Sequence, residues 1–161
     1  MEKITTEFKQ ISIRGRLAFG MTCLEKLVIT LNSDHPLLQT IVFPKIWEFT
    51  STEDLSEWEE NINNIDPVCV LDDEVNSKLK ELYNKLPKDI VSTIEEVITI
   101  GTANLYGGTN NNSPSTLEPL NSIIKTMIKL NVPLPDIRPF KKSSFSEFHG
   151  WGENRKRDFY Q

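Results

Sequence analysis

Apolar residues recur at helical spacing over most of the 161-residue chain. From residue 14 onward they fall three or four positions apart, which is the spacing that places side chains on one face of an α-helix. The residues on this face are Leu17, Met21, Leu24, Val28 and Leu31. Phe19, Cys23 and Leu27 cover a second face. Because a helix that is apolar on two faces buries both, we expect this helix to lie at the centre of a bundle.

The same periodicity predicts further helices, for a total of about six. Their apolar positions lie within residues 37–42, 55–65, 75–86, 90–98 and 117–130. Side-chain oxygens and negative charge favour helix starts, so we expect caps at Ser51 or Thr52, at Asp72 or Asp73, and at Thr116. Residues 4–13 have no clean period and fit either a short strand or an extended lead-in. The predicted fold class is an all-α bundle.

Prolines and glycines mark the breaks between these helices. Pro44 cannot donate an interior helix hydrogen bond, so we expect it to kink or break the second helix. Asp66-Pro67 ends the third, and residues 68–71 are predicted to return to the core. The clearest loop is residues 106–115, which are rich in glycine and asparagine. Helix pairs of about 35 residues also leave a solenoid-like stacking open.

The C-terminal segment, residues 138–161, is basic and aromatic. It carries six basic side chains together with Phe140, Phe145, Phe148, Trp151 and Phe159. So many aromatic residues favour a segment that packs back on the bundle. We therefore predict a single domain over residues 1–161, with an extended C-terminal segment lying against it.

Composition adds a cellular expectation. The chain is 38% hydrophobic and 25% charged, as in ordinary globular proteins. Cys23 and Cys69 lie in apolar stretches, which favours two reduced, buried thiols. The N-terminus lacks the apolar run of a signal peptide, and no segment approaches the roughly 18–20 apolar residues that cross a bilayer. We expect a cytoplasmic protein that does not associate with membranes; the oligomeric state stays open.

The net charge of −5 is unevenly distributed. Residues 47–96 hold fourteen carboxylates against four lysines, whereas residues 1–46 and 138–161 are net basic. A segment so acidic repels phosphate, which argues against nucleic acid as a partner of that face. It favours a cationic partner, or it serves solubility alone.

Residues that could carry catalysis or hold a metal are scattered. His35 and His149 are distant from each other and from both cysteines, whereas a zinc site needs three or four such ligands at defined spacings. The sequence therefore predicts no metal, no cofactor and no enzymatic activity. An enzyme whose site assembles from dispersed residues is a less favoured alternative. Its candidates are Arg14, Arg16, Tyr106 and His149.

The main candidate site is an acidic surface flanked by two tryptophans. Glu53, Glu57 and Glu60 fall at i, i+4 and i+7, on the face opposite the apolar stripe. A charged field steers the encounter with a partner protein, and aromatic anchors slow dissociation. The predicted partner-binding residues are Trp47, Glu53, Glu57, Trp58, Glu60, Asp72, Asp73 and Glu74. The alternative is a solvated face above two core tryptophans.

Arg14-Gly15-Arg16 and the basic C-terminal segment form a second constellation. It suits an anion or a peptide, but internal pairing with the acidic middle of the chain is the favoured interpretation. Residues 14–25, which open the first long helix, resemble the start of small all-helical bacterial proteins encoded beside toxins. The chain's size, acidity and lack of catalytic motifs are similar to those of immunity proteins of polymorphic-toxin and contact-dependent inhibition systems. The resemblance carries over no functional residue.

These observations favour a non-enzymatic, immunity-type protein that binds a basic protein partner, such as a nuclease toxin. Its acidic helical surface would mimic phosphate and occlude the partner's lysines and arginines. The alternative is a helical scaffold or adaptor that holds a peptide in a groove between helices. The two differ in the salt dependence of binding, which is strong for the first and weak for the second.

Overall fold

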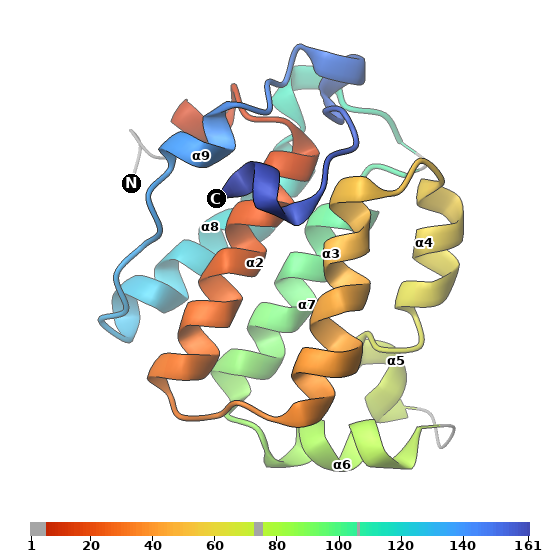
Figure 1. Ribbon diagram of the computed structural model, residues 1–161, viewed down its shortest axis with the longest axis vertical. Coiled ribbons are helices and arrows are strands. Elements are labelled where there is room, and N and C mark those ends of the chain that lie inside the picture. The colour runs from red at the N-terminus through yellow and green to blue at the C-terminus, as the bar shows by residue number, and fades with distance from the viewer. Residues whose placement is uncertain (1–5, 73–75, 106) are drawn as a thin grey trace.

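The computed structural model describes residues 6–72, 76–105 and 107–161. These residues form an all-α bundle of eight α-helices (Figure 1). The helices are α2 (Ile13–Thr30), α3 (Phe43–Ser51), α4 (Leu55–Ile62), α5 (Pro67–Asp72), α6 (Ser77–Lys85), α7 (Lys88–Thr102), α8 (Pro114–Lys129) and α9 (Arg138–Lys141). Four short turns complete the elements, namely the π-helical η1 (Leu38–Val42) and the 3₁₀ segments η2 (Asn110–Asn112), η3 (Glu147–Gly150) and η4 (Arg157–Tyr160).

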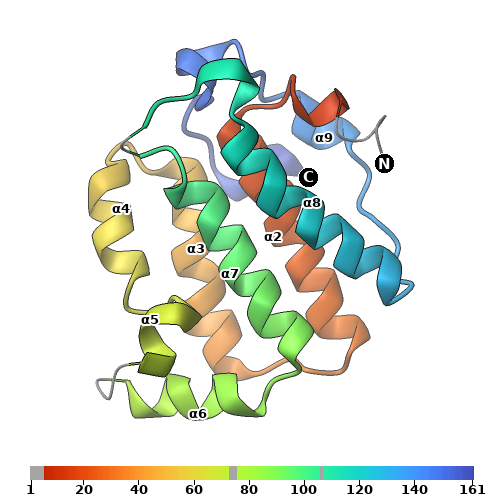
Figure 2. The ribbon, with the colours of Figure 1, turned by 180° about the vertical axis from the view of Figure 1, so that it is seen from behind.

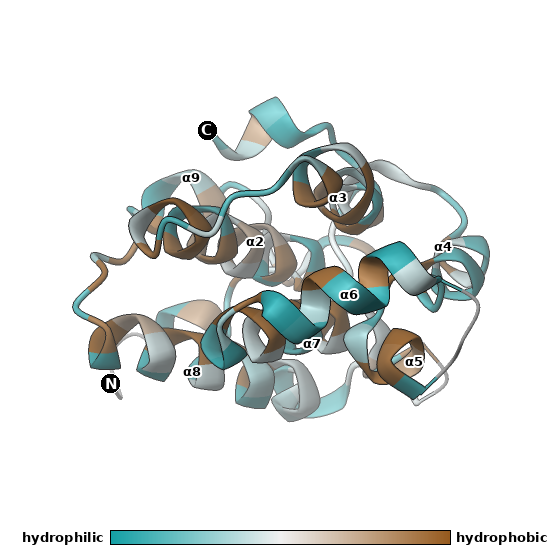
Figure 3. Ribbon diagram, turned by 90° about the horizontal axis from the view of Figure 1, so that it is seen from below, coloured by the Kyte–Doolittle hydropathy of each residue, from teal (hydrophilic) through white to brown (hydrophobic). Residues whose placement is uncertain are grey.

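Helix α2 lies at the centre of the bundle, as the two apolar faces predict. Every residue from Ile13 to Met21 is buried, and burial continues on two faces as far as Val28. Helices α3, α7 and α8 pack around it (Figure 2). Seen along the bundle, the apolar segments of α2, α3 and α7 gather in the interior, while α6 carries several hydrophilic residues at the lower end (Figure 3).

Pro44 changes the helix type rather than ending the helix. Because proline has no N–H, the turn before it widens into η1, where the Phe43 N–H donates to the Leu38 carbonyl. Helix α3 then continues with Pro44 in its first turn, where the missing donor costs no interior hydrogen bond. The predicted kink is therefore a π-helical turn.

Several predicted helix starts are shifted. Asp54, not Ser51 or Thr52, caps α4 by accepting from the Glu57 N–H at 2.9 Å. Asn76 caps α6, whereas Asp72 ends α5. Helix α8 begins at Pro114, two residues before Thr116. Asp54 and Asn76 cap their helices because their side chains reach a backbone N–H of the first turn, and a linear pattern of polar residues does not reveal that geometry.

The segment after Pro67 returns to the core only in part. Pro67 and Val70 are buried, but Val68 and Cys69 lie on the outer face of the short α5. The expectation of two buried thiols is therefore correct for Cys23 and wrong for Cys69. Burial raises the pKa of the Cys23 thiol to about 12, which leaves it protonated and unreactive.

The C-terminal segment packs back on the bundle, as predicted. Residues 143–160, which we call the strap, run across the N-terminal end of α2 and the C-terminal end of α3 (Figure 1). The Ser12 N–H donates to the Ser143 carbonyl, and the Arg155 N–H donates to the Thr50 carbonyl. Residues 4–13 do not form a strand in their described part, where Ile11 makes one isolated antiparallel bridge to Ser144.

No helix among the described residues is both long and apolar enough to cross a membrane.

Candidate functional site

The outward face of α4 is acidic. Glu53, Glu57 and Glu60 are all exposed, as their helical spacing predicts, and Asp72 is exposed at the end of α5. Glu48 and Asp54 are exposed as well, while Glu59 is half-buried. Asp73 and Glu74, which the sequence also assigned to this surface, lie outside the described residues. We call the exposed carboxylates Glu48, Glu53, Asp54, Glu57, Glu60 and Asp72 the acidic face.

The acidic face is not neutralised from within. Between Lys45 and Lys78 the sequence contains no basic residue. The ion pairs of the described residues leave out every carboxylate of the acidic face. Its charge therefore faces solvent uncompensated.

The basic C-terminal segment pairs internally, but with other carboxylates than expected. Arg157 contacts Glu25 of α2 at 2.6 Å, and Lys141 contacts Glu7 at 2.9 Å. Arg155 binds Glu147 within the strap at 2.7 Å. The expected pairing with the acidic middle of the chain is therefore wrong for the described residues, because the strap crosses the N-terminal end of α2 and its arginines meet Glu25, Glu147 and Glu153 (Figure 1).

Both tryptophans of the predicted surface lie in the core. Trp58 is 2% exposed, its ring packs edge-on against Phe49, and its Nε1–H donates to the Lys45 carbonyl at 2.9 Å. Trp47 is 8% exposed and donates to Glu25 at 2.9 Å. Neither ring is presented as an anchor for a partner. The carboxylates thus form the surface without the aromatic component that the sequence suggested.

Arg16 is a buried structural cation. It is fully buried, and its Nε–H donates to the carbonyls of Phe8 and Ile11, both at 3.0 Å. Its Nη1 donates to Thr116 Oγ1 at 2.7 Å and to the carbonyl oxygen of Asn112 at 2.9 Å. Burial lowers the pKa of Arg16 to about 10, so the group stays charged at neutral pH. This arginine therefore ties the segment before α2 to the start of α8.

Arg14 is also buried, but it borders a cavity. The cavity measures about 500 Å³. It is lined by Arg14, Glu53, Leu55, Phe148, His149, Trp151, Gly152 and Asn154. Two members of the dispersed set considered for an enzyme, Arg14 and His149, thus meet here, whereas Arg16 does not line the cavity and Tyr106 lies outside the described residues. The sequence alone does not reveal this arrangement, because Arg14, residues 53–55 and residues 148–154 are distant from one another in the chain.

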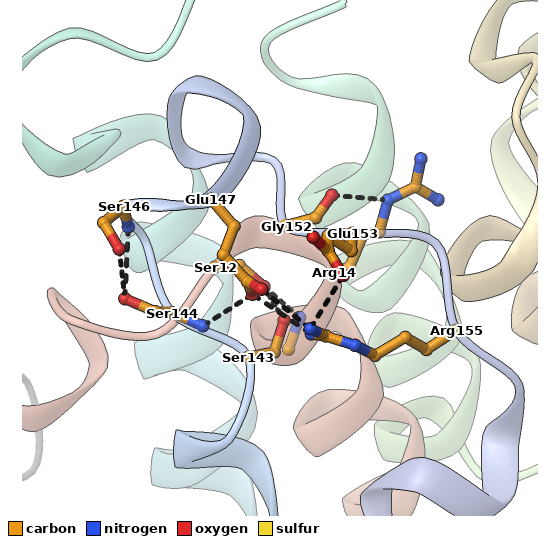
Figure 4. A network of polar contacts seen from close by, with 10 residues as sticks. Ser12, Arg14, Ser143, Ser144, Ser146, Glu147, Gly152, Glu153 and Arg155 are labelled. Carbon is orange, nitrogen blue, oxygen red and sulfur yellow. Dashed lines mark hydrogen bonds and ion pairs between the residues drawn. The ribbon is translucent and has the colours of Figure 1, made fainter.

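The strap that forms one wall of this cavity is held by a polar network (Figure 4). Arg155 donates to both carboxylate oxygens of Glu147, at 3.0 and 2.7 Å, and Glu147 also accepts from the Ser144 N–H. The hydroxyls of Ser12 and Ser143 lie 2.5 Å apart. The contact with Arg155 lowers the pKa of Glu147, so this carboxylate remains ionised and the network persists in mild acid.

A second group of carboxylates, on α7 and beside it, has raised pKa values. Partial burial raises the pKa of Asp66, Glu95 and Glu96, and repulsion adds to this for Glu95 beside Asp66 and for Glu96 beside Glu95 and Glu118. A carboxyl whose pKa is raised in the folded state favours folding below its ordinary pKa, and that contribution is lost as the pH rises through the folded pKa.

Glu96→Gln is therefore expected to raise the free energy of unfolding at pH 7 by about 0.5 kcal/mol, since it removes like-charge repulsion on a half-exposed surface. The gain should shrink towards zero at pH 4, where the carboxyl is protonated. Urea unfolding at both pH values measures it. Glu81→Gln is the control: contact with Lys85 lowers the pKa of Glu81, so its replacement brings no gain. An equal gain at both pH values for Glu96→Gln would contradict the electrostatic cause.

Among the described residues, no three histidine, cysteine or carboxylate side chains come close enough to hold a metal ion. No protein-family model, curated protein or solved structure matches the chain at a significant level.

Proposed function

We propose that this protein binds a basic protein partner through the acidic face and acts by occlusion. The observation that carries the proposal is the uncompensated charge of α4 and its flanks, on a molecule whose strap arginines are engaged in internal pairs. An acidic surface without internal counter-ions attracts a cationic protein from a distance and raises the rate of encounter.

The class of partner follows from the same chemistry. Exposed carboxylates on α4 and the segments beside it can occupy the lysines and arginines with which a nuclease binds phosphate, and so block the substrate without any reaction. A nuclease toxin neutralised in the cytoplasm is the partner of this kind that we propose, in line with the resemblance of residues 14–25 to toxin-immunity proteins. Because the tryptophans are buried, the partner would contact the exposed carboxylates of the acidic face with its own basic side chains.

Charge reversal on α4 tests this proposal. Glu57→Lys with Glu60→Lys is expected to slow association with the basic partner at least about tenfold at low salt, because the steering field is inverted locally. The partner is first captured from the native lysate at low salt and identified by mass, and its association rate is then measured with purified protein. The control, Glu118→Lys with Asp158→Lys, changes the net charge equally at two exposed residues that do not belong to the acidic face.

The two variants separate a local site from a general charge effect. Slower association in the α4 variant alone supports the acidic face as the binding surface. Equal slowing in both variants would show that only net charge matters. A captured partner that remains bound at high salt, or that is acidic, would contradict the proposal and favour a scaffold that binds a peptide through apolar contacts.

A further inference from the structure

The cavity beside Arg14 has the chemistry of a ligand site. Its volume of about 500 Å³ lies within the range of small-molecule sites in proteins. One side is apolar, formed by Leu55, Trp151 and Phe148, and the Phe148 side chain is 63% exposed. A large aromatic side chain left so exposed at the edge of a cavity has apolar surface available for a bound molecule.

Arg14 brings a positive charge to the cavity, whose lining also contains the carboxylate of Glu53. The arginine is 6% exposed, yet it takes part in none of the ion pairs among the described residues. Its Nε–H donates to the Gly152 carbonyl at 3.2 Å, and its Nη1 donates to the Phe49 carbonyl. Hydrogen bonds to these two carbonyls fix the guanidinium through Nε and Nη1. Figure 4 shows the guanidinium pointing away from the Glu147–Arg155 pair.

The wall of the cavity that the strap forms contains residues with unusual backbone conformations. Phe148 and His149 both adopt left-handed backbone conformations, with φ of 45° and 55°. Gly152 has φ of 85°, and a Cβ there would lie 2.6 Å from Ser12 Cβ, so only glycine fits. Strained backbone of this kind persists where the surroundings enforce it, and it clusters at ligand sites. Here the Glu147–Arg155 contact lies next to these residues in the chain, and the pair of serine hydroxyls lies against Gly152.

We propose that this cavity binds a small organic anion, a single carboxylate carried on an aromatic or branched apolar body. The guanidinium of Arg14 complements a carboxylate in charge, and the surfaces of Phe148 and Trp151 receive the apolar body. Glu53 at the lining opposes a second negative charge, which disfavours phosphate groups. The carboxylate belongs either to a free acid or to the C-terminal residue of a peptide.

Calorimetric titration with phenylacetate tests the anion and the body together. Phenylacetate is expected to saturate one site per chain, and phenylacetamide, which has the same shape without the charge, is expected to bind at least about tenfold more weakly. N-acetyl-alanyl-phenylalanine, as free acid and as amide, distinguishes the two sources. If the dipeptide acid binds and phenylacetate does not, the ligand is a chain end; the reverse result assigns a free acid.

Two variants place the bound anion in this cavity. Phe148→Ala removes an exposed ring without disturbing the core and is expected to weaken phenylacetate binding about tenfold. Ile128→Ala, at another exposed apolar residue that lies on α8 and does not line the cavity, is the matched control and should change nothing. Arg14→Lys keeps the charge but loses the planar donor pair, so it should also weaken binding; its thermal unfolding is recorded alongside.

Three results would overturn the proposal: no saturable binding of either acid, equal binding of acids and amides, or unchanged affinity in Phe148→Ala.

The inference goes beyond the proposed function and does not depend on it. The Glu57→Lys with Glu60→Lys variant should bind phenylacetate as the original protein does, because neither residue lines the cavity. A failure of partner binding and a failure of ligand binding are therefore distinguishable.

Discussion

Replacing Arg16 with methionine is expected to lower the free energy of unfolding by about 3–5 kcal/mol, a large share of the stability of an ordinary domain. Methionine fills much of the same volume but donates no hydrogen bond. The carbonyl oxygens of Phe8 and Ile11 and the hydroxyl of Thr116 would then stay buried without the donor that now serves them. The cost comes from these unsatisfied acceptors rather than from a lost ion pair.

Urea unfolding followed by circular dichroism measures this effect. Arg16→Lys is the informative partner variant: it keeps the charge but cannot reach the same set of acceptors, so we expect a loss of about 2 kcal/mol. Arg138→Met is the control, because Arg138 is exposed and its contact with Asp136 lies at the surface, so its effect should be small beside that of Arg16→Met. A loss of less than about 1 kcal/mol for Arg16→Met would show that water replaces the guanidinium.

Trp58→Ala is expected to cost about 3–5 kcal/mol, since it empties a large volume in the core. The ring fills the space beside Gly101, where a Cβ would lie only 2.5 Å from the ring edge. It also packs against Phe49, with ring centroids 4.8 Å apart. Trp58→Phe keeps most of the packing and loses the hydrogen bond to Lys45, so its expected cost is about 1–2 kcal/mol.

The same variants distinguish a core residue from a binding anchor. Unfolding in urea should show the full loss for Trp58→Ala, whereas the affinity of the folded fraction of Trp58→Phe for a basic partner should equal that of the original protein. Phe148→Ala, at an exposed aromatic, is the stability control and should cost less than about 0.5 kcal/mol. A stable Trp58→Phe variant with weakened partner binding would restore the tryptophan to the interface.

Periodicity predicts much of this fold because burial follows helical faces. Leu17, Met21 and Leu24 fall on one face of α2 and are all buried, and Glu57 and Glu60 fall opposite the apolar stripe of α4 and are exposed. The packing of the C-terminal segment was also predictable, because its aromatic residues have too much apolar surface to stay in water. These predictions depend only on local spacing and on hydrophobicity.

The remaining features depend on contacts between distant segments. Charge alone suggests that Arg14 and Arg16 pair with carboxylates, but both bind backbone carbonyls, whose positions a sequence does not reveal. Trp58 lies on the apolar stripe of α4, so its burial was predictable from spacing; the acidic neighbours suggested an anchor instead. The cavity joins residues 14, 53 and 148, and no local pattern connects them. Cys69 is exposed because α5 is too short to bury more than one face.

The strap also determines which contacts of the fold form last while the chain is being synthesised. The cap of the central helix is completed by Ser143, which leaves the ribosome 131 residues after Ser12. Until then the nascent chain carries α2 with an uncovered N-terminal end, and the non-local contacts that close it must form last. A chain without the strap would lose the Gly152 carbonyl that accepts from Arg14 and the Trp151 ring beside Phe49, so this end of the bundle stays incompletely covered until the last residues have been added.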